Sequence, residues 1–115
     1  YINSDKRIIS CDSGSKEVDV SKIIYIESSG HKVTYHIHGK EFGDYVVKSK
    51  LDDIENELKE YKYLLRVHQS YIVNMMYVNN ISSYRVYLKN GIDLGVPKSR
   101  YKEVKKRILE FKENN

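Results

Sequence analysis

The chain has 115 residues, with 20 Lys and Arg against 16 Asp and Glu and a formal net charge of +4. This length suits a single domain with a modest core, and so small a positive excess does not by itself indicate a nucleic-acid partner. The single cysteine excludes an internal disulfide and suits a reducing compartment, and no apolar run is long enough for a membrane span. Because the chain begins at Tyr1 and not at Met, we expect a piece of a longer cytoplasmic protein.

The first half of the chain carries the period-two alternation of short β-strands. The predicted strands cover residues 7–11, 17–20, 22–27, 32–38 and 41–47. The first two form a hairpin around Asp12-Ser13-Gly14-Ser15, and a Gly39-Lys40 turn leads into the last. In the fourth strand apolar side chains share one face and polar ones the other, namely Val33, Tyr35 and Ile37 against Lys32, Thr34, His36 and His38.

Two amphipathic helices are predicted from apolar side chains spaced three and four residues apart. Ser49 is expected to cap the first helix, with Asp52 in the capping-box position, and the second helix follows Pro97. Their apolar positions are Leu51, Ile54, Leu58 and Tyr61 in the first and Tyr101, Val104, Ile108 and Phe111 in the second. Strands are predicted at residues 64–70, 71–74, 84–88 and 92–96. The sequence therefore predicts a mostly β domain (β-rich α+β) of antiparallel strands.

A row of polar side chains follows the predicted strand at residues 64–70. Arg66, His68 and Ser70 are two residues apart, so an extended strand places them on one face. A cation, an imidazole and a hydroxyl together suit the binding of phosphate or carboxylate. Two interpretations stay open: Arg66 contacts phosphate, or its guanidinium is an internal strut bonded to a carboxylate, while His68 and Ser70 satisfy a sheet edge.

Charge is unevenly distributed along the chain. Residues 98–112 hold seven basic and two acidic side chains, whereas residues 51–60 hold five acidic ones and Lys59. The C-terminal segment could therefore meet a polyanion while the acidic helix is kept away from it. The plainer interpretation of the C-terminal charges is a solvated helix face.

Catalysis is not expected from this sequence. His31, His36 and His38 make a metal site conceivable, but no further ligand stands at a recognisable spacing, so a solvated sheet face is favoured. Cys11 has no evident histidine partner, and no Gly-rich phosphate loop is present. We expect no enzyme, no cofactor and no metal.

Three segments follow one another in the order of a known family. Residues 25–32 read Tyr-Ile-Glu-Ser-Ser-Gly-His-Lys, and residues 66–74 read Arg-Val-His-Gln-Ser-Tyr-Ile-Val-Asn. Residues 90–96 read Asn-Gly-Ile-Asp-Leu-Gly-Val and are followed by Lys98-Ser99-Arg100. Together they resemble the LytTR family of bacterial DNA-binding domains, whose most characteristic segment is F-x-R-x-H-x-S; here Leu64 stands where Phe is usual. The resemblance covers about residues 18–111.

The resemblance implies an elongated body of three small antiparallel sheets, with one short internal helix and a C-terminal helix. Residues 1–115 then form one domain with its core at 18–111, and residues 1–17 are a hairpin or a linker from a preceding domain. It also implies the output domain of a response regulator, in which a receiver domain lies on the N-terminal side. Loops would enter successive major grooves of direct-repeat promoter sites, where a second copy binds the tandem repeat.

The resemblance also implies roles for individual residues. The base-reading positions are His31, Gln69, Lys98 and Arg100. The resemblance implies a backbone contact for Lys32, and from the residue types we also expect phosphate contacts from Arg66, His68, Ser70, Ser99 and Lys102. The residue types agree, since Gly30 permits close backbone approach and Lys or Arg can reach guanine in the major groove. The alternative function is a protein-interaction module that docks an acidic partner on the basic face of residues 98–112.

Overall fold

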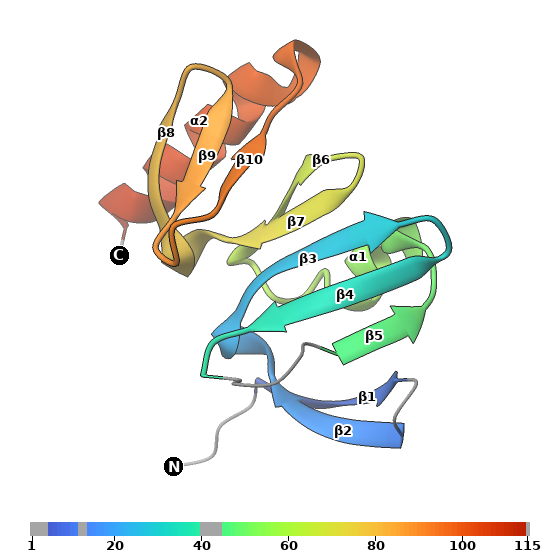
Figure 1. Cartoon of the computed structure of the whole chain (residues 1–115). Coiled ribbons are helices and arrows are strands. Elements are labelled where there is room, and N and C mark those ends of the chain that lie inside the picture. The colour runs from blue at the N-terminus through green and yellow to red at the C-terminus, as the bar shows by residue number, and fades with distance from the viewer. Residues whose placement is uncertain (1–4, 12–13, 40–44, 115) are drawn as a thin grey trace.

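The computed structural model describes residues 5–11, 14–39 and 45–114. Its strands form three antiparallel sheets, with the orders β1-β2, β5-β4-β3-β7-β6 and β10-β9-β8 (Figure 1). The strands are β1 (Lys6–Cys11), β2 (Gly14–Asp19), β3 (Ile23–Ser29), β4 (Lys32–Ile37), β5 (Tyr45–Lys48), β6 (Leu64–His68), β7 (Tyr71–Asn74), β8 (Val78–Ser82), β9 (Arg85–Leu88) and β10 (Asp93–Gly95). The helices are α1 (Leu51–Glu57) and α2 (Lys98–Glu113).

The five-stranded sheet is central because it is covered on both faces. Alternation along β7 directs Ile72 into one hydrophobic cluster and Val73 into the other. One cluster holds α1 and the β1–β2 hairpin against β3 and β4. The other holds α2 and the three-stranded sheet against β6 and β7. Two cores thus share one sheet.

The alternation predicted for β4 is confirmed. Val33, Tyr35 and Ile37 are buried in the cluster beneath α1. The opposite side chains of β4 stay exposed or half-buried, and His36 lies 2.6 Å from the Glu27 carboxylate while stacking on Tyr25. This face of β4 therefore carries a half-buried polar pair on the sheet.

The predicted second helix is also confirmed. It begins at Lys98 directly after Pro97, and Val104 and Ile108 are buried against the three-stranded sheet and β6. The spacing of three and four residues explains this packing, since it places the apolar side chains on one helix face.

Several local predictions were wrong. Ser49 does not cap α1: Lys50 is the N-cap and no side chain accepts a hydrogen bond there. The helix ends at Glu57, although Leu58 and Tyr61 remain buried. Strand β8 was not predicted, because its two asparagines disfavour a strand by composition. Residues 40–44 of the strand predicted at 41–47 lie outside the described residues, as do residues 12 and 13 of the first turn.

The shape also differs from the elongated body that the family resemblance implied. The extents along the principal axes are 39, 39 and 27 Å, so the domain is a flattened body with two equal long dimensions. Covering both faces of the central sheet produces this thickness. No helix in the described part of the chain is long and apolar enough to cross a membrane.

Candidate nucleic-acid interface

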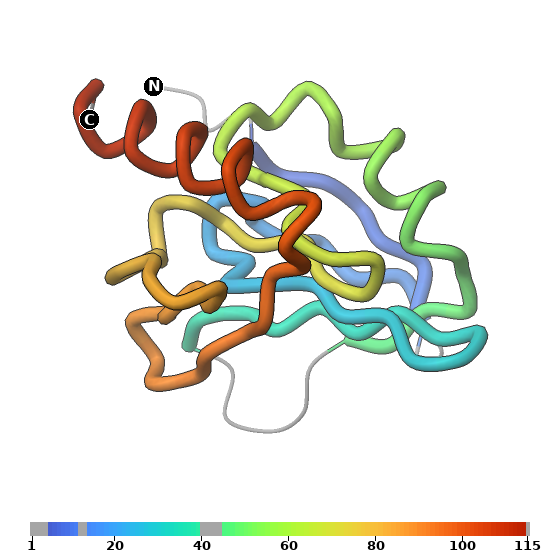
Figure 2. The backbone as a smooth tube through the Cα atoms, turned by 90° about the horizontal axis from the view of Figure 1, so that it is seen from above, coloured from blue at the N-terminus to red at the C-terminus, as the bar shows by residue number. Residues whose placement is uncertain are grey.

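Three chain reversals lie along one side of the molecule. In Figure 1 the turn between β3 and β4 lies at the right edge, the turn between β6 and β7 lies above it, and the N-terminal end of α2 lies at the top. Seen from above in Figure 2, the β3–β4 turn lies at the right edge, and the β6–β7 turn and the start of α2 lie progressively closer to the middle. We call this surface, made of residues 30–32, 69–70 and 98–100, the turn side. Every base-reading residue expected from the sequence belongs to it.

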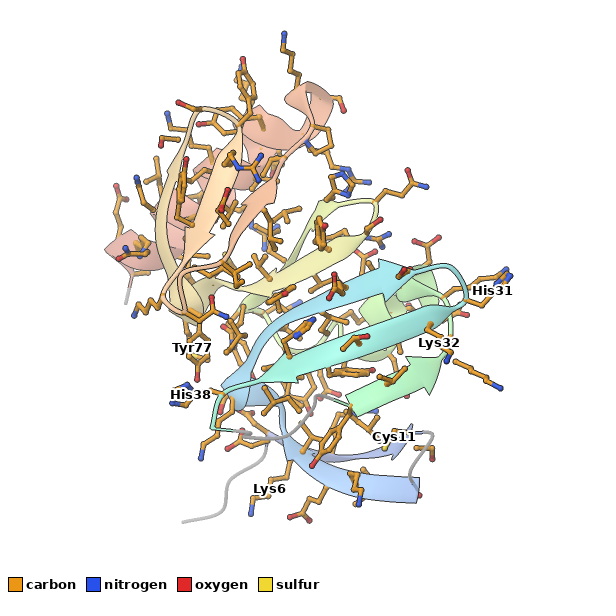
Figure 3. All side chains as sticks on the ribbon, in the orientation of Figure 1. Lys6, Cys11, His31, Lys32, His38 and Tyr77 are labelled. Atoms are coloured by element: carbon orange, nitrogen blue, oxygen red, sulfur yellow. The ribbon has the colours of Figure 1, made fainter. Side chains whose placement is uncertain are left out.

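The β3–β4 turn presents an exposed histidine. Gly30 has a φ of 62°, a left-handed conformation that glycine adopts without strain, and His31 follows it. The His31 carbonyl accepts a hydrogen bond of 3.2 Å from the Ser49 amide, which ties the turn to the segment after β5. Figure 3 shows the His31 side chain projecting from the tip of this hairpin. The backbone of the turn is thus held in place, and the exposed His31 imidazole can contact a partner outside the domain.

Lys48, next to the β3–β4 turn, is a basic residue that the sequence reasoning missed. It lies opposite Lys32 in the antiparallel pairing of β4 and β5, and both side chains are exposed. Like charges directly opposite in a sheet destabilise it, so an anionic partner would relieve this pair. The signal was hidden because the two lysines are far apart in the sequence and meet only through strand register.

The β6–β7 turn differs from the predicted polar row. Strand β6 ends at His68 after a register shift, and Gln69 and Ser70 form the turn. The row was predicted on one continuous strand, so that prediction was wrong. The Ser70 amide donates to His68 Nδ1 at 3.0 Å, which leaves Gln69 as the exposed side chain of the turn.

Arg66 fits the strut interpretation. Its Nη1 lies 2.9 Å from the Asp52 carboxylate and 2.8 Å from the Glu55 carboxylate. Its Nε donates to the His68 carbonyl at 2.8 Å and its Nη2 to the Gln69 carbonyl at 2.5 Å. With only 9% of its side chain exposed, Arg66 joins α1 to the turn and holds the backbone that carries Gln69.

Replacing Arg66 by Ala is expected to lower the free energy of unfolding by about 2–3 kcal/mol, because two backbone carbonyls and two carboxylates lose a charged donor. Urea unfolding measures this. The matched control is Arg85→Ala: Arg85 pairs with Asp93 at a site where both side chains are over two-fifths exposed, so the expected loss is below about 1 kcal/mol. Equal losses in the two variants would exclude the strut.

The N-terminal end of α2 is unusually basic. Lys98, Ser99, Arg100 and Lys102 are all exposed, and the first turn contains no acidic residue. Helix N-termini carry partial positive charge, so cations there repel the helix dipole and acidic side chains are the stabilising choice. The exposed amides and the added cations together make this end a suitable place for an anion.

Tyr84 is a second residue that the sequence reasoning missed. It occupies the two-residue turn between β8 and β9 with a φ of 63°, after Ser83 with a φ of 52°. Such turns usually contain Asn or Gly, and a bulky residue there is strained. Tyr84 is 46% exposed, its ring packs on Tyr101, and Lys98 Nζ lies 5.8 Å from the ring centroid. The signal was an aromatic residue in a tight turn, which could be seen only once β8 was known.

No group of three or more His, Cys, Asp or Glu side chains within the described ranges could hold a metal ion.

A small β-rich body with exposed cations at the β3–β4 turn and at the start of α2 suits the binding of a polyanion such as DNA. The LytTr DNA-binding domain family matches residues 13–109, and the chain belongs to that family.

One named protein and one solved structure are also similar to this chain. Over 97 residues the chain is 33% identical to the sensory transduction protein LytT of Bacillus subtilis (strain 168), covering 79% of the chain and 38% of that protein. The chain thus spans about two fifths of the length of this relative. The fold is shared with the LytTr DNA-binding domain of a Bacillus cereus protein described as a methyl-accepting/DNA response regulator. That structure has a TM-score of 0.71 at 21% identity, over 92% of this chain and 97% of that one.

Proposed function

We propose that this domain binds promoter DNA with sequence specificity, as the non-catalytic output domain of a cytoplasmic response regulator. The observation that carries the proposal is the turn side, where the exposed residues His31, Gln69 and Lys98 stand at three chain reversals. A duplex lying along this side would meet the β3–β4 turn and the α2 corner in successive major grooves.

The proposed contacts divide by chemistry. His31, Gln69, Lys98 and Arg100 read base edges, since Lys and Arg match guanine and the amide of Gln matches adenine. Exposed Lys32, Lys48, Ser99 and Lys102 contact phosphates, which position the protein and carry affinity. Arg66, His68 and Ser70 act indirectly in this account. The side chains of Arg66 and His68 and the backbone of Ser70 hold the β6–β7 turn, and this supporting role takes the place of the direct phosphate contacts expected from the sequence.

The wider setting is also a proposal. The relative LytT is named as a sensory transduction protein, and the chain covers 38% of it. A receiver domain on the N-terminal side is consistent with that larger protein. The loop-in-groove mode favours pairs of direct repeats, each occupied by one copy of the domain.

Selection of bound duplexes from a random pool tests this function. The expected result is a half-site repeated at a spacing of about one helical turn, ~10–10.5 bp. Binding should weaken steeply with salt, with a log–log slope near −0.9 per phosphate neutralised. Recovery of random sequences, or binding to an acidic protein partner with no preference among duplexes, would contradict the proposal and favour an interaction module.

Tyr84 gives a further prediction. The Tyr84 ring lies beside Lys98. In this proposal the Tyr84 hydroxyl donates a hydrogen bond to a phosphate at the edge of the major groove that Lys98 enters. Tyr84→Phe keeps the ring and is expected to weaken DNA binding about three- to tenfold, the effect of one lost hydrogen bond. Fluorescence anisotropy with the selected duplex measures this. The matched control is Tyr77→Phe, because Tyr77 packs near His38, away from the turn side (Figure 3). Equal affinities for wild type and Tyr84→Phe would remove Tyr84 from the interface.

A further inference from the structure

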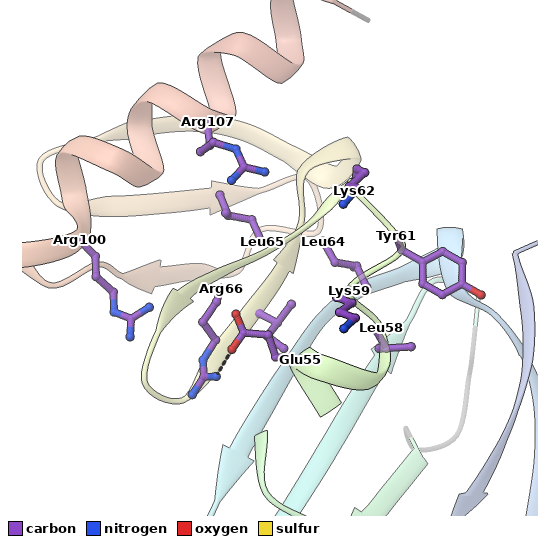
Figure 4. A pocket seen from close by; sticks show the side chains of 11 residues that line it. Glu55, Leu58, Lys59, Tyr61, Lys62, Leu64, Leu65, Arg66, Arg100 and Arg107 are labelled. Atoms are coloured by element: carbon purple, nitrogen blue, oxygen red, sulfur yellow. Dashed lines mark hydrogen bonds and ion pairs between the residues drawn. The ribbon is translucent and has the colours of Figure 1, made fainter. Parts of the chain in front are cut away.

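A basic cleft lies between α2, β6 and the segment after α1, with a volume of about 310 Å³ (Figure 4). Its apolar lining comes from Leu58, Tyr61, Leu64, Leu65 and Ile72. Its cations are Lys59, Lys62, Arg66, Arg100 and Arg107. Glu55 is the one acidic residue among the described residues that line it.

The charge of the cleft is largely uncompensated. Glu55 is paired with Arg66, which Asp52 also neutralises. Lys59, Lys62 and Arg107 are exposed, and none of them makes an ion pair with the described part of the chain. Arg100 is likewise exposed, and Figure 4 shows it extending from α2 toward Arg66. Cations from two separate parts of the chain therefore surround an apolar strip, at a mutual electrostatic cost in the free domain.

We propose that this cleft docks an acidic amphipathic peptide segment of a partner protein, in addition to the DNA contacts of the turn side. An apolar side chain of the segment packs on Leu64 and Leu65, and flanking carboxylates meet Lys62 and Arg107. Arg–carboxylate pairs supply directional, charge-assisted hydrogen bonds, and burial of the apolar side chain supplies affinity.

The apolar strip argues against a stretch of DNA backbone as the occupant, because a charged phosphate gains nothing from an apolar surface and deoxyribose far less than a Leu or Phe side chain. The position of Arg107 along α2 also argues against DNA as the occupant. Arg107 stands seven residues after Arg100, about 10 Å farther along the helix and away from the turn side. A small inorganic anion would meet one or two of these cations, whereas a peptide segment can span the cleft.

Affinity selection from a phage-displayed library of random dodecapeptides on the whole domain tests the proposal. We expect the selected peptides to carry several Asp or Glu residues around a Leu, Ile or Phe. The charge-reversed double variant Lys62→Glu/Arg107→Glu is expected to bind the selected peptides at least about tenfold more weakly. The matched control Lys105→Glu/Lys106→Glu makes the same change in charge on α2 outside the cleft, and is expected to reduce peptide binding by less than about threefold.

Two measurements keep the outcomes distinct. Thermal unfolding confirms that each variant folds, and anisotropy with the selected duplex reports DNA binding separately. Lys62→Glu/Arg107→Glu is expected to retain DNA affinity within about threefold, because neither residue belongs to the turn side. The proposal would be contradicted if no acidic peptides were selected, or if Lys62→Glu/Arg107→Glu left peptide binding unchanged. A loss of DNA affinity as large as the loss of peptide affinity would instead assign the cleft to DNA.

Discussion

Replacing Asn74 by Ala is expected to lower the free energy of unfolding by about 3 kcal/mol and the Tm by more than about 10 °C. Asn74 is fully buried at the end of β7. Its Nδ2 donates to the carbonyls of Ser21 at 3.0 Å and Ile23 at 2.9 Å, and its Oδ1 accepts from the Met76 amide at 2.9 Å. Removing the side chain leaves three backbone groups without this partner, in a place where water cannot replace it.

The position of Asn74 explains why this effect is large. The side chain links the end of β7 to the start of β3 and to the short helical turn before it. It therefore holds together two strands that each contribute side chains to both cores. The matched control is Asn90→Ala. Asn90 also accepts a backbone amide, from Ile92 at 3.1 Å, but in an exposed turn, and the expected loss is about 1 kcal/mol or less. Equal losses by thermal and urea unfolding would show that the buried bonds of Asn74 contribute nothing beyond a surface turn.

Replacing His31 or Lys98 by Ala is expected to lower discrimination between the selected site and random DNA by about five- to 150-fold for each residue. The two variants should differ in salt dependence. Lys98→Ala removes a cation and should make the log–log slope shallower by about one, whereas His31→Ala removes a group that hydrogen-bonds to a base and should leave the slope unchanged. Competition binding at several salt concentrations measures both quantities.

Controls for these variants exist on other surfaces. His38→Ala removes an exposed histidine at the other end of β4 (Figure 3), and Lys89→Ala removes an exposed lysine in the β9–β10 turn. Both are expected to retain the wild-type preference. If His31→Ala preserved full discrimination, base reading by the β3–β4 turn would be wrong even if the domain still bound DNA.

Periodicity predicted the parts of the fold that packing determines. The alternation along β4 and the three-and-four spacing along α2 each create one apolar face, and each face is buried as expected. These signals are strong because one misplaced register would expose the whole face. Strand β8 gave no such signal, since Asn79 and Asn80 interrupt it and only its pairing with β9 defines it.

The candidate site was harder to predict because register and local hydrogen bonds decide it. The polar row of Arg66, His68 and Ser70 suggested an exposed strand face, but a bulge and a turn direct Arg66 toward backbone carbonyls and carboxylates and His68 toward the Ser70 amide. Lys48 lies beside Lys32 only through strand pairing, and Tyr84 reaches its position beside Lys98 only through a left-handed turn, so both belong to the candidate interface through tertiary structure alone. Such contacts depend on residues distant in sequence, which a single chain read in order does not reveal.

The central claim is that the β3–β4 turn and the N-terminal corner of α2 engage one duplex at the same time. Titration of the ¹⁵N-labelled domain with the selected duplex tests this directly by amide chemical shifts. The account predicts large changes at residues 30–32, 69–70, 84 and 98–100 in the same titration, with little change in β1 and β2. Changes confined to the outer surface of α2, with residues 30–32 unperturbed, would contradict it.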